Sequence, residues 1–319
     1  MISNGRLRLA ALGILVLVVP PALALALRHR APDTGAPSAV PAPPPPPTGR
    51  AFVLGRQIGP LAAGIRAEPR PSGVQATATL LGPGGPASGY RARLVLLSSG
   101  GSAEHAAQPC GPGCYGALLP ADGTPRTLRL SVDGPGARGT AVFPLPDRWP
   151  PPSAAALLSR AVRTFRSLRS VVTEQRLASG LGAAVQTRYV QLAPNRFTYE
   201  IEGGPQAVVI GDERWDRSTP KGRWQRTETD PIPTPFLEWS GEPRDATLIG
   251  SGRVAGRPAW LVSFDVVRGG DPIWFTVSID KATDRFLDLH MTTTAHFMHD
   301  RYSAFDAPAR IEPPRAATP

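Results

Sequence analysis

The hydrophobic pattern is clearest between Ser153 and Ser170, where it predicts an amphipathic helix. At about 100° per residue, the apolar side chains of this stretch fall within one arc of about 140°, the width expected of a helix that faces a core. They are Leu157, Leu158, Ala161, Val162, Phe165 and Leu168. Prolines at 150–152 exclude a helix that enters from upstream, and Ser153 is a favourable N-cap, so we expect the helix to begin there.

After this helix the pattern changes to short alternating runs rich in β-branched and aromatic residues, which are typical of β-strands. We expect strands at 171–177, 185–192, 196–201, 206–210, 213–216, 222–226, 246–249, 259–264, 273–279, 286–294, 302–305 and 311–314. No second helix of comparable quality follows. Residues 153–314 are therefore predicted to form a long antiparallel sheet packed on one helix.

The region from 50 to 147 alternates in the same way between turns rich in glycine and proline. We expect strands at 73–80, 91–96, 115–119, 128–132 and 140–143. Six or seven short strands over about a hundred residues indicate an immunoglobulin-like β-sandwich. The fold class is therefore mainly β throughout the folded part of the chain.

The N-terminus carries an apolar run at 9–27, nearly long enough to span a bilayer. Pro20, Pro21 and the triplet at 24–26 favour a cleaved signal peptide within 1–30, whereas the length and the basic residues at 28–30 favour a retained anchor. The proline-rich stretch at 31–49 predicts an extended tether. We expect a single-pass protein of a bacterial cell membrane with its body outside the cytoplasm, or a secreted protein if cleavage occurs.

The charge pattern and the absence of catalytic motifs argue against two classes of function. Lys and Arg number 35 against 25 Asp and Glu, giving a net charge of +10, but the arginines are scattered and are not interleaved with aromatic residues. This pattern argues against a nucleic-acid partner. The sequence contains no nucleophile elbow, no zinc-protease helix motif and no glycine-rich phosphate loop, so we expect no enzyme activity and no cofactor.

Both cysteines lie close together, at Cys110 and Cys114. The Gly-Pro-Gly between them can turn tightly enough to bring the two side chains within disulfide reach. Outside the cytoplasm such a pair is most often oxidised, so we expect a structural disulfide. The alternative is a pair of thiolates that binds copper(I).

Several stretches together resemble the lipoprotein-carrier fold of LolA and of mycobacterial LppX and LprG. They are 193–199, 209–217, 277–291 and the spaced Tyr302, Phe305 and Pro308. The resemblance implies a curved antiparallel half-barrel that holds lipid chains between its concave face and helices. The chain departs from that family in having no cysteine for lipid attachment and only one clear helix.

The region at 50–147 resembles the small β-sandwich modules of the FixH/YtkA type. Its strand plan and the stretch from Cys110 to Tyr115, which leads into a strand, carry this likeness. The resemblance implies an envelope module.

Period-two alternation along 287–299 places the odd positions, which are mostly apolar, on one face of a strand. With the helix, this face predicts a groove for an apolar or lipid ligand. Its candidate residues are Leu157, Val162, Phe165, Leu168, Leu289, Met291 and Phe297. The tryptophans, nearly all of which lie in residues 153–314, could line this groove. Core packing is the alternative explanation for them.

The same stretch gathers His290, Met291, His296, Met298 and His299, a set that copper favours. On one continuous strand, His290 and His296 share a face but lie about 20 Å apart, and His299 points away from them. Only His296 and Met298 are then spaced to hold one ion. Two ligands make a weak site, so we expect no metal.

Three functions follow from the sequence. The first is a membrane-tethered, non-enzymatic extracytoplasmic binding protein for an apolar or lipid ligand. The second is a copper-handling envelope accessory protein. The third is a structural or interaction module whose half-barrel is filled by its own side chains.

Overall fold

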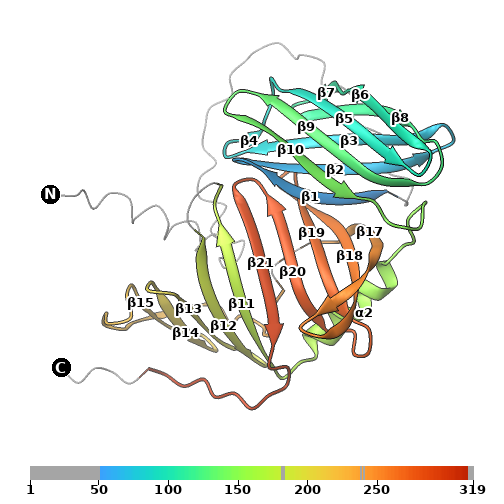
Figure 1. The fold of residues 1–319 in the computed structure, drawn as a ribbon. Coiled ribbons are helices and arrows are strands. Elements are labelled where there is room, and N and C mark those ends of the chain that lie inside the picture. The colour runs from blue at the N-terminus through green and yellow to red at the C-terminus, as the bar shows by residue number, and fades with distance from the viewer. Residues whose placement is uncertain (1–50, 181–183, 238, 240, 315–319) are drawn as a thin grey trace, which may run out of the picture. The chain divides into compact units, whose positions relative to one another are not determined.

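The computed structural model describes residues 51–180, 184–237, 239 and 241–314. These residues form antiparallel sheets and one α-helix (Figure 1), so the predicted mainly β fold class is confirmed. The predicted membrane segment at 9–27 and the tether at 31–49 lie outside the described residues. Within the described ranges, no helix has the length and apolar character needed to cross a membrane.

Residues 52–144 form two antiparallel sheets around a shared apolar core. The strands are β1 (Phe52–Ile58), β2 (Leu61–Arg70), β3 (Gly73–Gly82), β4 (Gly85–Pro86), β5 (Arg91–Ser98), β6 (Gly101–Ala106), β7 (Gln108–Gly111), β8 (Cys114–Pro120), β9 (Pro125–Gly134) and β10 (Ala137–Pro144). One sheet has the order β1-β2-β3-β8-β7, with β4 paired to β3, and the other has the order β10-β9-β5-β6. Both contribute to one core, for example through Val74 and Leu80 of β3 and Leu94 of β5. This arrangement is a β-sandwich.

Residues 170–303 form a single antiparallel sheet of eleven strands (Figure 1). The strands are β11 (Ser170–Ala178), β12 (Val185–Leu192), β13 (Arg196–Ile201), β14 (Gln206–Ile210), β15 (Glu213–Arg217), β16 (Gln225–Glu228), β17 (Arg244–Val254), β18 (Arg257–Arg268), β19 (Asp271–Asp280), β20 (Phe286–Thr293) and β21 (His296–Ser303). Their order is β16-β15-β14-β13-β12-β11-β21-β20-β19-β18-β17. The first and last strands of the segment, β11 and β21, therefore pair in the middle of the sheet.

The helix α2 (Ala155–Arg166) packs on one side of this sheet, which we call the helix face. Leu158, Ala161 and Phe165 are its buried residues. The predicted N-cap differs from the observed one. Ala154 occupies that position without a side-chain cap, because the backbone of Ser153 forms a β-bridge with Thr247 and so extends the sheet.

The chain from 229 to 243, of which 238 and 240 lie outside the described residues, is a second cover over the helix face, and we call it the strap. It joins β16 to β17, the two opposite edges of the sheet, and so must cross from one edge to the other. Thr234 anchors it: its amide donates to the carbonyl oxygen of Pro194 at 2.8 Å and its hydroxyl donates to that of Leu192 at 2.7 Å. The sequence pattern did not predict this element.

β1 and β2 were not among the predicted strands, because β2 is buried on both faces and its apolar residues do not alternate. Ile65 points into the sandwich core, whereas Ala62 packs against Trp274 of β19. A Cβ atom on Gly64 would lie 1.9 Å from the Trp274 ring, so this close approach requires glycine. Conversely, no strand forms at 311–314, where two prolines lack the amide hydrogens that a ladder needs.

The stretch at 287–299 is a hairpin and not one continuous strand. β20 ends at Thr293, β21 begins at His296, and Met291 pairs with Met298 across the ladder. The turn carries no glycine, proline or asparagine to signal it. Ala295 instead adopts a left-handed φ of 56°.

The turn between β19 and β20 depends on the carboxylate of Asp280. Its Oδ1 accepts hydrogen bonds from the amides of Ala282 and Thr283 at 3.0 and 2.8 Å, and its Oδ2 lies 2.8 Å from Nε of Arg257. Burial alone would raise the pKa of Asp280, but the hydrogen bonds from Thr283 and Ala282 and the charge of Arg257 lower it below 3.8.

We predict that Asp280→Asn lowers the free energy of unfolding of the full chain by about 1–3 kcal/mol at pH 7, because buried donors lose a charged acceptor. The folded-state pKa is depressed, so this stabilisation is complete above pH 3.8 and is lost as the pH falls through the folded-state value. Denaturant unfolding at pH 7 and pH 3 measures both effects. The control Asp284→Asn breaks only an exposed pair with Arg160 and should cost less than about 1 kcal/mol. An equal cost at both pH values would contradict the assignment.

Candidate functional site

The structure brings six of the seven predicted groove residues together between α2 and the sheet. They are Leu157, Val162, Phe165, Leu168, Leu289 and Met291. Phe297 lies on the opposite face, beside Trp274. The reason is the turn at Ala295, which reverses the alternation so that Met298 takes the inward place. Whether these residues line a ligand groove stays a prediction.

Aromatic side chains fill the space under α2 and the strap. The ring centroid of Phe165 lies 5.9 Å from that of Phe286 and 5.5 Å from that of Tyr302. Trp239, carried by the strap, lies 5.2 Å from Phe264 and 5.7 Å from Phe286. Edge-to-face contacts at these distances are favourable for aromatic pairs. The strap therefore contributes to the core, through Trp239 and also through Leu237.

The middle of the helix face is polar, although it is equally buried. On β11, β12 and β21 the inward positions include Thr173, Gln175, Thr187, Gln191 and Asp300, each no more than 5% exposed. Strand register places them side by side, since Gln175 pairs with both Thr187 and Asp300. The helix face thus joins an aromatic part on β18–β20 to a polar centre on β11, β12 and β21.

Alternation along β11 is a signal for this polar centre in the sequence. Thr173 and Gln175 occupy alternate positions of a strand whose flanking residues, Val171 and Leu177, are apolar. Period two places all four on one face, so two polar residues lie on a face that is otherwise apolar. Gln175 bonds to neighbours within the core: its amide donates to the sulfur of Met298 at 3.1 Å, and its oxygen accepts from the hydroxyl of Tyr189 at 3.4 Å.

The predicted weak metal pair of His296 and Met298 has other contacts. Met298 is 2% exposed and its sulfur accepts the hydrogen bond from Gln175. Nδ1 of His296 lies 3.0 Å from the carbonyl oxygen of Thr294 in the turn. The sulfur therefore belongs to the apolar core, and nothing in this geometry joins the two side chains around an ion.

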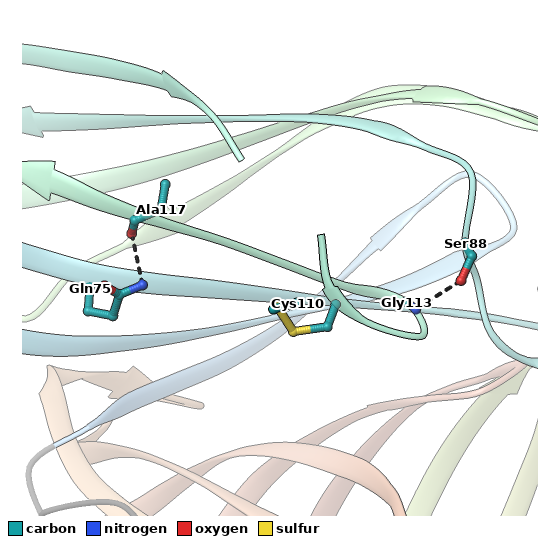
Figure 2. Close-up of a disulfide and its surroundings, with 6 residues drawn as sticks. Gln75, Ser88, Cys110, Gly113 and Ala117 are labelled. Carbon is teal, nitrogen blue, oxygen red and sulfur yellow. Dashed lines mark hydrogen bonds between the residues drawn. A yellow bond between two sulfur atoms is a disulfide. The ribbon is translucent and has the colours of Figure 1, made fainter. Parts of the chain in front are cut away.

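Cys110 and Cys114 form the predicted disulfide, with Cα atoms 5.0 Å apart (Figure 2). The bond closes the turn between β7 and β8. The amide of Gly113 in that turn donates to Oγ of Ser88 at 3.1 Å, which ties the turn to the connection between β4 and β5. Gly113 has a positive φ of 64°, a conformation that glycine adopts without strain. In this state the two sulfurs are bonded to each other and are not thiolates.

Comparison with solved structures finds similarity over about half of the chain. The crystal structure of LprF from Mycobacterium bovis matches at 13% identity and a TM-score of 0.40, covering 52% of this chain and all of LprF. The lipoprotein LppX from Mycobacterium tuberculosis matches at 12% identity and a TM-score of 0.37, covering 50% of this chain and 97% of LppX. A LolA-superfamily protein from Nitrosomonas europaea matches at 10% identity and a TM-score of 0.23, covering 50% of this chain and 95% of that protein.

The lipoprotein-carrier family that the sequence of residues 153–314 resembles includes LppX and LolA. No protein-family model and no curated protein matches the sequence. At these identities and TM-scores the likeness supports no statement about function. The basis for a functional proposal is instead the geometry of this chain. The resemblance of residues 50–147 to FixH/YtkA-type modules stays a prediction.

We predict that Phe165→Ala lowers the free energy of unfolding by about 3–5 kcal/mol, because Phe165 is 1% exposed and its ring contacts two others. Arg163→Ala, on the exposed side of α2, should change it by no more than about 0.5 kcal/mol. Denaturant unfolding of the full chain measures both. Equal costs for the two variants would show that α2 does not pack on the sheet through Phe165.

Proposed function

We propose that this chain is a non-enzymatic binding protein for an apolar or amphiphilic lipid, which it holds on the helix face of the eleven-stranded sheet. One observation carries the proposal. The helix face joins an aromatic part to a buried polar centre, and part of its cover is a strap that belongs to no strand or helix. A lipid has the same two chemical parts, an apolar chain and a polar head.

Three prolines of the strap flank its anchor and do not lie in the part that carries Trp239. Pro231, Pro233 and Pro235 have no amide hydrogen, so this stretch has few backbone donors that need a partner. The hydrogen bonds of Thr234 anchor the strap near β12 and β13. Trp239 lies beyond this anchor in sequence and adds ring contacts. We infer that Thr234 is the fixed point and that the Trp239 side chain moves away from the rings when a ligand binds.

Movement of Trp239 would uncover Phe264, Phe275 and Phe286, the three rings that it contacts. An acyl chain placed there would restore the buried apolar area, at about 25 cal/mol per Å². The ring of Phe286 lies 6.4 Å from that of Tyr302 on β21, the strand that also carries Asp300. A chain that follows these rings would bring its polar head to the polar centre.

We also propose that residues 9–27 tether the protein to a bacterial cell membrane, with the body outside the cytoplasm, or direct its secretion if the segment is cleaved. The apolar run and the proline-rich tether support this placement. The disulfide between Cys110 and Cys114 supports an oxidising compartment.

A second candidate is a structural or interaction module whose sheet is filled by its own side chains. The observation in its favour is the continuous set of ring contacts from Phe165 through Phe286 to Trp239, which leaves the described aromatic part already packed. The two candidates differ in whether Trp239 gives way to a ligand.

Binding of cis-parinaric acid, a fluorescent fatty acid, to the full chain separates them. We predict that the fluorescence of the acid rises on binding and that Trp239→Ala tightens binding about tenfold, because a closed strap competes with the ligand for the same surface. Trp224→Ala is the matched control, since Trp224 packs against Arg217 at the far edge of the sheet. It should leave the affinity unchanged.

If neither the wild-type chain nor Trp239→Ala binds the acid, the self-filled module is the correct function. If both tryptophan variants tighten binding equally, the ligand does not displace the strap. Native mass spectrometry of the full chain provides an independent result, because a carrier should copurify with lipid.

A further inference from the structure

The β20–β21 hairpin presents a cluster of ligand atoms on the outer face of the sheet, opposite to α2. Asp288 and His290 are two residues apart on β20 and so point to the same side. His299 lies directly across from His290 on β21. The hairpin turn at Ala295 therefore brings together two histidines that a continuous strand would have separated.

Three ligand side chains converge in this cluster. Nε2 of His290 lies 3.1 Å from Oδ1 of Asp288, and Nε2 of His299 lies 2.5 Å from Oδ2 of the same carboxylate. The two imidazole rings stack with centroids 4.1 Å apart and planes 7° from parallel. One ligand atom from each residue lies within 4.8 Å of the other two.

We propose that Asp288, His290 and His299 form a binding site for a divalent first-row transition metal ion, of which Zn²⁺ is the representative. Two imidazole nitrogens and one carboxylate oxygen are ligands that this class of ion prefers, and Zn²⁺ binds them at about 2.0–2.2 Å. Tetrahedral coordination at those lengths separates neighbouring ligand atoms by about 3.4 Å. The N···O separations of 3.1 and 2.5 Å are shorter than this, so the Asp288 carboxylate must move away from the two histidines, by about 0.9 Å at His299.

The exposure of the three side chains suits entry of an ion. Asp288 is 14% exposed and fixed between the histidines, whereas His290 is 57% exposed and His299 is 26% exposed. Both histidines border a cavity of about 560 Å³ on the outer face. Three protein ligands leave a further coordination position, which faces this cavity and would take water or an anionic group.

The surrounding charges determine the affinity that we expect for the metal ion. Arg56 and Arg176 line the same cavity, and Arg301 lies across from Asp288 in the ladder. These cations weaken the binding of a metal ion, so we expect micromolar and not tighter affinity. They would also attract an anion to the open coordination position. The metal site shares no residue with the helix face. A failure of metal binding therefore says nothing about lipid binding, and the reverse also holds.

Titration of the full chain with Co²⁺ and Zn²⁺ tests the proposal. Co²⁺ provides visible absorption bands that report nitrogen and oxygen ligands and their number, and Zn²⁺ competition with a chromophoric chelator gives the affinity. We predict one equivalent of each ion. His290→Ala, His299→Ala and Asp288→Asn should each weaken binding at least tenfold and remove the Co²⁺ bands.

The matched controls are His105→Ala and His296→Ala, which change histidines outside the cluster and should leave binding unchanged. His290 is more than half exposed, so its variant should keep the circular dichroism spectrum of the wild type. No binding at one equivalent would overturn the proposal and leave the cluster as a hydrogen-bonded pair of histidines on Asp288. Binding that survives His290→Ala with His299→Ala would overturn it as well.

Discussion

The structure of residues 170–303 depends on covering one buried face of a very wide sheet. Eleven strands spaced about 4.8 Å apart extend over roughly 48 Å, whereas a helix of the length of α2 extends over about 18 Å. One helix cannot cover that width. The strap supplies the remaining cover over the aromatic part, through the contacts of Trp239 with Phe264, Phe275 and Phe286. This division of the cover between a helix and an irregular segment is what makes a binding function physically reasonable.

The two faces of the central strands carry different chemistry because side chains alternate along a strand. On β21, Met298 and Asp300 point inward to the helix face, while His299 between them points outward. β20 shows the same division, with Leu289 and Met291 inward and His290 outward. A lipid site and a metal site can therefore occupy the same two strands without sharing a side chain.

Much of this fold could be predicted from the sequence where the pattern is periodic. The amphipathic stripe located α2 to within a few residues, and strict alternation located β13 and most of its neighbours. β2 was missed because it is buried on both sides, which removes the alternation. The strap was missed because a proline-rich crossover resembles an ordinary loop until the order of the strands is known.

The candidate site was predicted less completely, for a local reason. The turn at Ala295 lacks the residues that usually mark a hairpin, so the alternation was extended through it. That single error placed Phe297 on the wrong face and separated His290 from His299, which the ladder brings together. The disulfide between Cys110 and Cys114 was predicted correctly, because it depends only on a short tight turn.

The central claim is that lipid displaces Trp239 from the helix face. It is tested most directly by ¹⁹F NMR of the full chain with its six tryptophans replaced by 5-fluorotryptophan and assigned by single Trp→Phe changes. Addition of oleate should move the Trp239 resonance toward that of the free amino acid, and the Trp224 resonance should not move. Binding of oleate that leaves the Trp239 resonance in place would contradict the account.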